Sequence, residues 1–275
     1  MIYNEILGFT CFILIGMSLG LLGGGGSIFT LPTLVYVLGI SPLISSTYSL
    51  FIVGIISMTG AIHYIRKRQV HYLSAILFAI PALIFVSITR HYLKTSSIQI
   101  DYHPGIFLKN QNFLIMLLFA GLIIWAGFSM ITRNKNKEFY HQRPLIQRYG
   151  MLSISGAIIG ALTGVVGIGG GFLIVPVLVL LINLPMNIAV GTSLIIIALK
   201  SLIGFVIDLK AVDIDWSFLI FFSLMGIIGI GLGTYLSPHI EEIRLKKYVG
   251  WFMLCLGISI LFKEIFLQSH SIQQI

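Results

Sequence analysis

The sequence predicts an all-α polytopic membrane protein made of two related halves, and three observations lead to this fold. Of the 275 residues, 57% are apolar and only 9% are charged, whereas soluble domains carry about 25% charged residues. The apolar residues gather in runs, and one crossing needs about 20 residues, so the chain has room for about eight apolar segments. A glycine-rich pattern occurs twice along the chain. This composition excludes a soluble nucleic-acid-binding protein, and the net charge of +8 is attributed to cytoplasmic loops.

Each half begins with two short apolar stretches separated by a glycine run, Gly23–Gly26 or Gly167–Gly171. The stretches cover 6–22 and 27–38 in the first half, and 150–166 and 172–183 in the second. Because these lengths fit a full crossing poorly, each pair predicts a glycine-broken helix pair or a re-entrant hairpin, with full crossings as the alternative. Longer runs follow and predict spanning helices at 43–64, 71–92, 112–132, 187–207, 216–236 and 247–267.

Lys and Arg are concentrated in three connections, and this orients the segments. The loops at 66–68, 133–148 and 239–247 hold eleven of the seventeen basic residues, so they are predicted to be cytoplasmic. The 208–215 loop carries three aspartates and is predicted to lie outside, as are both termini. The chain therefore divides into a first transmembrane repeat at 1–132, a basic cytoplasmic linker at 133–149 and a second transmembrane repeat at 150–275.

The two halves match when the chain is shifted against itself by 144 residues. Pro32 then coincides with Pro176, and five glycines upstream of Pro32 coincide with glycines upstream of Pro176. Equivalent connections are basic at 65–70 and acidic at 208–215, so equivalent points are expected on opposite sides of the membrane. This predicts two inverted repeats, an architecture that places a transport site near the midplane.

The two glycine runs are predicted to line a ligand site inside the protein. Backbone amides at a helix break cannot face lipid, so the break is covered by protein or lines a wet cavity. A short helix is expected after each run, near Ser27 and Phe172, and its N-terminal amides favour an anion. Glycines at four-residue spacing within 16–20 and 156–164 are instead predicted to be helix-packing surfaces.

Lys200 is the most unusual residue of the apolar runs, because it lies at least seven residues from either end of 187–207. Seven residues are about 10 Å of helix, so its ammonium cannot easily reach the interface. A cation at that depth indicates a functional site, and a bound anion would neutralise it. The alternative is a lysine that reaches a water-filled vestibule without touching substrate.

Hydroxyl groups supply a third kind of candidate, and they either donate to an oxyanion or bond their own helix carbonyls. The predicted substrate-binding residues are Gly23, Gly24, Gly25, Gly26, Ser27, Thr47, Ser49, Gly167, Gly169, Gly170, Gly171, Thr192, Ser193 and Lys200.

Two segments resemble the signature of the sulfite exporter TauE/SafE family, GLLGGGGSIFTLP at 20–32 and GVVGIGGGFLIVP at 164–176. The segment AVGTSL at 189–194 resembles the one that follows this signature in the family. The first half departs from the pattern, with SSTYS at 45–49 where Ala-x-Gly-Thr-Ser is expected. The resemblance covers nearly the whole chain and implies a multi-pass permease of the bacterial inner membrane for small sulfur-containing anions such as sulfite or sulfonates.

The sequence therefore predicts a secondary transporter that moves one small anion by alternating access. A passive anion channel is the first alternative. A membrane-embedded enzyme is the second, and it is disfavoured because the apolar runs contain no paired carboxylates, metal-ligand spacing or activated nucleophile. No catalytic residue, metal or cofactor is predicted. The expected partners are the anionic substrate and the lipid bilayer, and assembly as a homodimer is left open.

Overall fold

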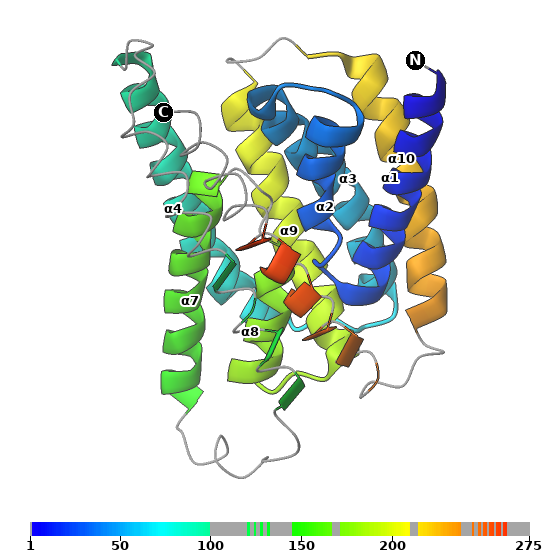
Figure 1. Cartoon of the computed structure of the whole chain (residues 1–275). Coiled ribbons are helices and arrows are strands. Elements are labelled where there is room, and N and C mark those ends of the chain that lie inside the picture. Colours follow the sequence, from blue (N-terminus) through cyan, green and yellow to red (C-terminus); the bar gives the residue numbers. More distant parts are fainter. Residues whose placement is uncertain are drawn as a thin grey trace.

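The computed structural model describes residues 2–99, 145–166, 171–209 and 214–237, together with short pieces within 120–132 and 244–262. All regular structure in this part of the chain is helical (Figure 1), which confirms the all-α prediction. The runs at 112–132 and 247–267 are described only in part, and most of the linker at 133–149 lies outside the described residues. The expectation of about eight apolar segments therefore stays a prediction.

The helix boundaries follow the breakers in the sequence. The first half contains α1 (Ile2–Leu22), α2 (Ser27–Pro32), the π-helical turn η1 (Thr33–Val37), α3 (Pro42–Arg66) and α4 (Tyr72–Gln99). The second contains α7 (Leu145–Val166), the 3-10 turn η2 (Gly171–Leu173), α8 (Ile174–Leu181), α9 (Met186–Asp208) and α10 (Trp216–Leu236). Pro42 and Pro185 stand at the starts of α3 and α9, where proline fits a helix. Asp215 caps α10 by accepting from the Phe218 amide at 3.0 Å.

Four helices are long and apolar enough to cross a bilayer. They cover Ile44–Arg66, Tyr72–Thr89, Met186–Asp208 and Trp216–Leu236, and Gly8–Leu22 is a shorter apolar helix. Large apolar side chains are exposed along the outer faces of α4 and α10, namely Ile76, Ile80, Ile84, Ile220, Leu224 and Ile228. Such apolar faces suit lipid rather than water, so the fold is that of a multi-pass membrane protein.

The first glycine run is the turn of a helical hairpin. Gly23 has φ +70°, a conformation that glycine adopts without strain. Gly26 packs directly on the Ile15 carbonyl of α1, and the chain then returns until Leu38 Cδ2 lies 2.9 Å from where a Cβ on Gly8 would be. Because Gly8 is near the start of α1, both ends of the hairpin lie at the same end of the bundle.

The second pair is a hairpin of the opposite direction. Gly171 lies against Ile197 in the middle of α9, whereas α8 ends at Leu181, shortly before α9 begins at Met186. Therefore α8 runs opposite to α9. Figure 1 shows α7 rising from the lower end and α8 returning toward it, while α1 descends from the upper end.

The helices α1, α3 and α10 form a first group that runs in one direction (Figure 1). Gly16 and Gly20 of α1 lie against Gly226 and Ile230 of α10 in the same order, and Gly60 of α3 also contacts Ile230. A Cβ on Gly16 would overlap the Gly226 carbonyl, so the two backbones approach as closely as two helices can. The prediction that these spaced glycines pack helices together is confirmed.

The helices α4, α7 and α9 form a second group that runs in the opposite direction (Figure 1). Gly156 and Gly160 of α7 lie against Phe78 and Ala82 of α4, again in the same order. The short turn after Arg66 reverses the chain between α3 and α4. Each group thus takes two of its three helices from one half of the chain and the third from the other half.

The two groups meet along α3 and α9, which pack against each other as antiparallel helices. Gly60 of α3 lies near Leu194 of α9, and Gly204 of α9 lies near Leu50 of α3. Small residues on both sides of this contact let the helices approach closely. The contact between α3 and α9 is therefore the main interface between the groups.

Candidate functional site

The first glycine run lies against α9 in the interior of the protein. A Cβ on Gly23 would be 2.6 Å from Ser193 Oγ and 2.9 Å from Val190 Cα. Ser193 is fully buried; its hydroxyl donates to the Val190 carbonyl at 2.8 Å and lies 3.4 Å from the Gly23 carbonyl oxygen. The structure thus brings together two predicted site residues that are far apart in sequence.

Ser27, which directly follows the first glycine run, meets Gly171, the last residue of the second. A Cβ on Gly171 would lie 3.2 Å from Ser27 Oγ and 2.5 Å from Ile197 Cδ1 of α9. Ser27 is 1% exposed, and its hydroxyl donates to the Gly24 carbonyl at 2.7 Å. Ser27 and Gly171 are also 144 residues apart, so equivalent positions of the two halves come into contact.

Lys200 is buried against α7. Its side chain is only 2% exposed, and Nζ donates to Thr163 Oγ1 at 3.0 Å. The Thr163 hydroxyl in turn donates to the Gly160 carbonyl at 3.2 Å. Ser193, Ile197 and Lys200 follow one face of α9, because residues at i, i+4 and i+7 share a face. In this structure the lysine lies in the packed interior rather than in an open vestibule.

The other predicted hydroxyls bond within the protein. Ser49 donates to the Ser46 carbonyl at 2.9 Å, and Thr192 donates to the Ile188 carbonyl at 2.6 Å. Thr192 also accepts from the His71 amide at 3.0 Å, which ties α9 to the turn between α3 and α4. These bonds follow the expectation that such hydroxyls bond their own helix carbonyls.

The remaining predicted residues are placed less centrally or are not described. Thr47 is buried in α3, and Gly24, Gly25 and Gly26 are buried at the tip of the first hairpin. The predicted residues that lie outside the described part of the chain are Gly167, Gly169 and Gly170.

Further polar residues are buried inside the bundle. Thr163 holds the Lys200 ammonium, yet in the sequence it is one small residue in a glycine-rich helix. Ser57, Ser201 and Thr30 are fully buried, and their hydroxyls have no hydrogen-bond partner. Ser57 and Ser201 occupy equivalent positions on α3 and α9, 144 residues apart. Buried polar groups normally have partners, so these three mark an interior that is not fully satisfied in this conformation.

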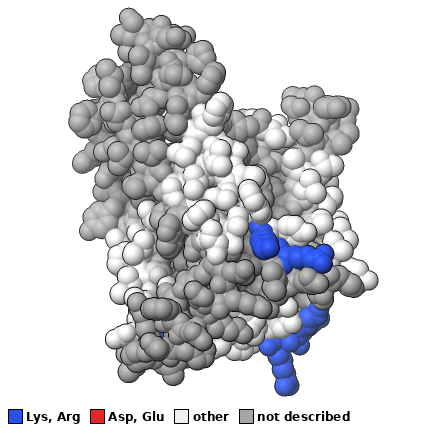
Figure 2. All heavy atoms as spheres, turned by 60° about the horizontal axis from the view of Figure 1, so that its bottom comes forward, with Lys and Arg blue, Asp and Glu red and all other residues white. Residues whose placement is uncertain are grey.

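One end of the bundle is basic. Arg66, Lys67 and Arg68 are exposed there, and Figure 2 shows Lys and Arg on this face with no Asp or Glu in view among the described residues. Within the described residues, no cluster of three or more His, Cys, Asp or Glu could hold a metal ion.

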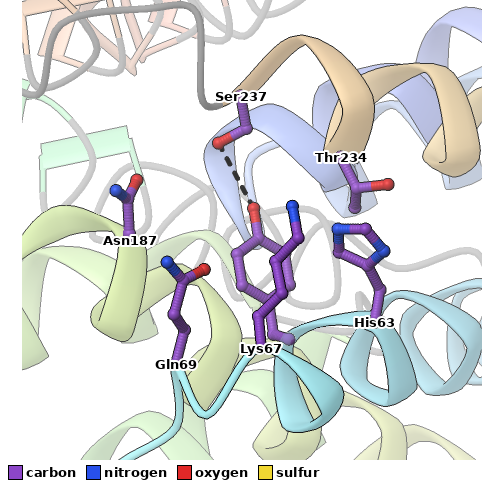
Figure 3. Close-up of a pocket in the computed structure, with 7 residues that line it drawn as sticks. His63, Lys67, Gln69, Asn187, Thr234 and Ser237 are labelled. Atoms are coloured by element: carbon purple, nitrogen blue, oxygen red, sulfur yellow. Dashed lines mark hydrogen bonds between the residues drawn. The ribbon is translucent and has the colours of Figure 1, made fainter.

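A polar pocket, called here the basic-end pocket, opens beside these cations. Its described lining is His63, Tyr64, Lys67, Gln69, Asn187, Thr234 and Ser237 (Figure 3). Tyr64 forms one wall, donating to the Gly20 carbonyl at 3.1 Å and hydrogen-bonding the Ser237 hydroxyl at 3.3 Å. Sequence reasoning missed this pocket, since its residues converge from the ends of α3, α9 and α10 and carry no shared motif.

The sequence is similar to that of a family of known proteins. The sequence model of the family described as sulfite exporter TauE/SafE matches residues 8–260. A probable membrane transporter protein of Xylella fastidiosa (strain 9a5c) is 32% identical over 255 residues, which cover 91% of this chain and 92% of the relative. The probable membrane transporter protein YunE of Bacillus subtilis (strain 168) is 22% identical over 274 residues, 94% of this chain and 100% of that protein. No solved structure matches significantly.

Proposed function

The chain belongs to the sulfite exporter TauE/SafE family of membrane transporters, and on this premise we propose that it is a secondary transporter for a small sulfur-containing anion, such as sulfite or an organic sulfonate. The family match confirms the resemblance inferred from the two glycine motifs. It supports a membrane transporter rather than an enzyme.

The buried ammonium of Lys200 carries the proposal. A lysine in the middle of a spanning helix costs about 2.5–3.5 kcal/mol on the membrane-insertion scale, and Ile56 at the equivalent position of α3 is apolar. Ile56 is also fully buried. The fold therefore accepts an aliphatic side chain at this position in the first half, whereas the second half has a cation at the equivalent position. An anion that binds near Lys200, Ser193 and the paired glycine runs is the occupant that this chemistry favours.

The inverted repeat is part of the proposal and is supported by paired contacts. The His71 amide donates to Thr192 Oγ1 at 3.0 Å, and the Asp215 amide donates to Tyr48 Oη at 2.8 Å. Adding 144 to 71 and 48 gives 215 and 192, so one contact becomes the other with the halves exchanged. The opposite directions of the two hairpins fit the same relation.

Alternating access follows from the arrangement of the two helix groups. Ser27, Ser193 and Lys200 are at most 2% exposed, so an anion reaches them only if surrounding helices move. The contact between α3 and α9 joins the groups through small residues, and each of these helices carries one buried hydroxyl without a partner, Ser57 in α3 and Ser201 in α9. We infer that the groups rock about this contact and expose the site to each side in turn.

The test is anion flux in proteoliposomes. Lys200→Met is expected to lower sulfite flux at least about tenfold, because a hydrogen bond to a charged group is worth about 1.5–3 kcal/mol and 1.4 kcal/mol is a factor of ten. The matched control is Ile56→Met, which creates the same residue at the equivalent position of the other half and is expected to transport normally. Wild-type flux in Lys200→Met would reject the site.

The same preparation distinguishes a carrier from a channel. A carrier gives saturable flux and is stimulated by unlabelled sulfite on the opposite side of the membrane. Ohmic single-channel currents would reject alternating access and leave the anion site intact. Binding of sulfite to wild-type protein without any flux would reject both the carrier and the channel.

A further inference from the structure

We propose that the basic-end pocket is a second anion-binding site, separate from the centre around Lys200, and that it takes a small free oxyanion. The pocket stands between the exposed cations of the 66–68 turn and the first glycine run. Nothing in this inference requires that the central site work as proposed, because the two sites share no residue.

The chemistry of the lining fits an anion. Lys67 offers three ammonium protons, and Gln69 and Asn187 offer side-chain amide protons. Figure 3 shows Lys67 between Gln69 on one side and His63 on the other, all at the same opening. None of the seven described lining residues is acidic, so the pocket has several charged or polar donors and no carboxylate to oppose an anion.

A separate observation concerns the His63 ring at the wall of the pocket. The Nε2 atom of His63 is buried and has no hydrogen-bond partner, although His63 lines the pocket. Buried ring nitrogens normally have a partner in protein or water. A rotation of the His63 ring that turns Nε2 toward the pocket would let an oxyanion oxygen accept from Nε2–H, while other oxygens accept hydrogen bonds from the Lys67 ammonium and the Asn187 amide.

The size of the pocket limits the ligand. The cavity volume is about 30 Å³, and one water needs about 10–15 Å³ of such space. A nucleotide or a peptide does not fit this volume, whereas a small ion that extends into the open mouth does. Sulfite, sulfate and phosphate belong to this class.

The position of the pocket links it to the central site. Tyr64 lines the pocket and donates to the Gly20 carbonyl at the end of α1, three residues before Gly23. Its ring also packs on Gly191 of α9, where a Cβ would lie 3.0 Å from Tyr64 Cγ. Tyr64 therefore separates the pocket from the first glycine run. An anion bound by Lys67 would lie on the side of the Tyr64 ring that faces away from this run.

The experiment measures oxyanion binding to the full-length protein after the central site has been disabled. Lys200→Met protein in nanodiscs is titrated calorimetrically with inorganic sulfite and, separately, with inorganic phosphate at low ionic strength. Lys67→Gln in this background is expected to weaken binding by about fivefold or more, an estimate that allows for solvent screening of an exposed lysine. The matched control is Arg68→Gln, which removes the same charge from the adjacent residue, outside the lining, and is expected to change affinity by less than about twofold.

Three results would overturn the proposal. Equal losses in Lys67→Gln and Arg68→Gln would indicate diffuse attraction to the basic end and no defined site. Absence of oxyanion binding in the Lys200→Met protein would leave a single, central site. Loss of sulfite binding when phosphatidylglycerol is added to the nanodiscs would assign the pocket to a lipid phosphate, whereas unchanged affinity is expected for a free oxyanion.

A second variant guards against misfolding. Asn187→Leu removes a pocket amide contributed by α9 and leaves the 66–68 turn intact. It is expected to weaken oxyanion binding as well. Both the Lys67→Gln and the Asn187→Leu proteins are expected to be monodisperse. Unchanged binding in Asn187→Leu would contradict the proposed lining. If Lys200→Met transports normally while Lys67→Gln weakens binding, the proposed function fails and the second site stands.

Discussion

Replacing Gly23 by Ala tests whether the first glycine run is held tightly against α9. Any residue with a Cβ at φ +70° meets a backbone penalty of about 1–2 kcal/mol. At Gly23 the new methyl group would also lie 2.6 Å from Ser193 Oγ, 2.9 Å from Val190 Cα and 3.0 Å from Val175 Cγ2. The serine can rotate, but the Val190 backbone cannot, and overpacking of this kind costs about 1–3 kcal/mol. The expected total for Gly23→Ala is therefore about 2–5 kcal/mol.

Gly39 provides a control for the backbone contribution. It has the same φ of +70°, and a Cβ there would meet nothing within 4 Å, so Gly39→Ala is expected to cost only about 1–2 kcal/mol. Equilibrium unfolding of both variants in the same detergent gives the two free energies of unfolding. Equal losses in the two variants would refute the close contact between the glycine run and α9.

Three further predictions concern the buried polar groups and the topology. Thr163→Val removes the acceptor of the Lys200 ammonium and is expected to lower the free energy of unfolding of the wild-type protein by about 1.5–3 kcal/mol. In the Lys200→Met protein the same change is expected to cost much less. Equal losses in both backgrounds would exclude an energetic coupling between Thr163 and Lys200. The double variant Ser57→Ala, Ser201→Ala is expected to keep or raise stability, because unpartnered buried hydroxyls cost free energy, while sulfite flux falls; a clear loss of stability would mean that these hydroxyls have partners. In a background without the native cysteines, a cysteine introduced in the 66–68 turn is expected to be protected from a membrane-impermeant thiol reagent in intact cells. A cysteine introduced near Asp215 is expected to be labelled. Equal labelling would contradict the inverted topology.

The spanning helices could be located from the sequence because their signals are local. The run predicted at 187–207 is α9 (Met186–Asp208), and the run at 216–236 coincides with α10 (Trp216–Leu236). Pro185 and the capping Asp215 stand directly before these two helices and mark where each one begins. The spaced glycines were also recognisable, since only a residue without a side chain lets two helix backbones touch.

The site could be predicted only as far as single residues stand out from their own segment. Lys200 is conspicuous because it is a cation in an apolar run. Its position in the middle of that run predicts that its side chain is buried. Its partner Thr163 is recognisable only after α7 and α9 are known to be neighbours. The basic-end pocket is harder still, because Asn187 and Ser237 become polar lining only when three helix ends converge.

The difference between Lys200 and Ile56 is an internal test of what the fold requires. Both residues are buried, at equivalent positions of α9 and α3, and Ile56 fills the space over Gly226 of α10. Burying a cation is costly, and replacing buried ionic groups by apolar ones is often neutral or stabilising. Packing alone would therefore favour an aliphatic residue at position 200 as well. The lysine has to be explained by something that the folded chain does not need for its own stability, and an anion that binds and leaves is such a reason.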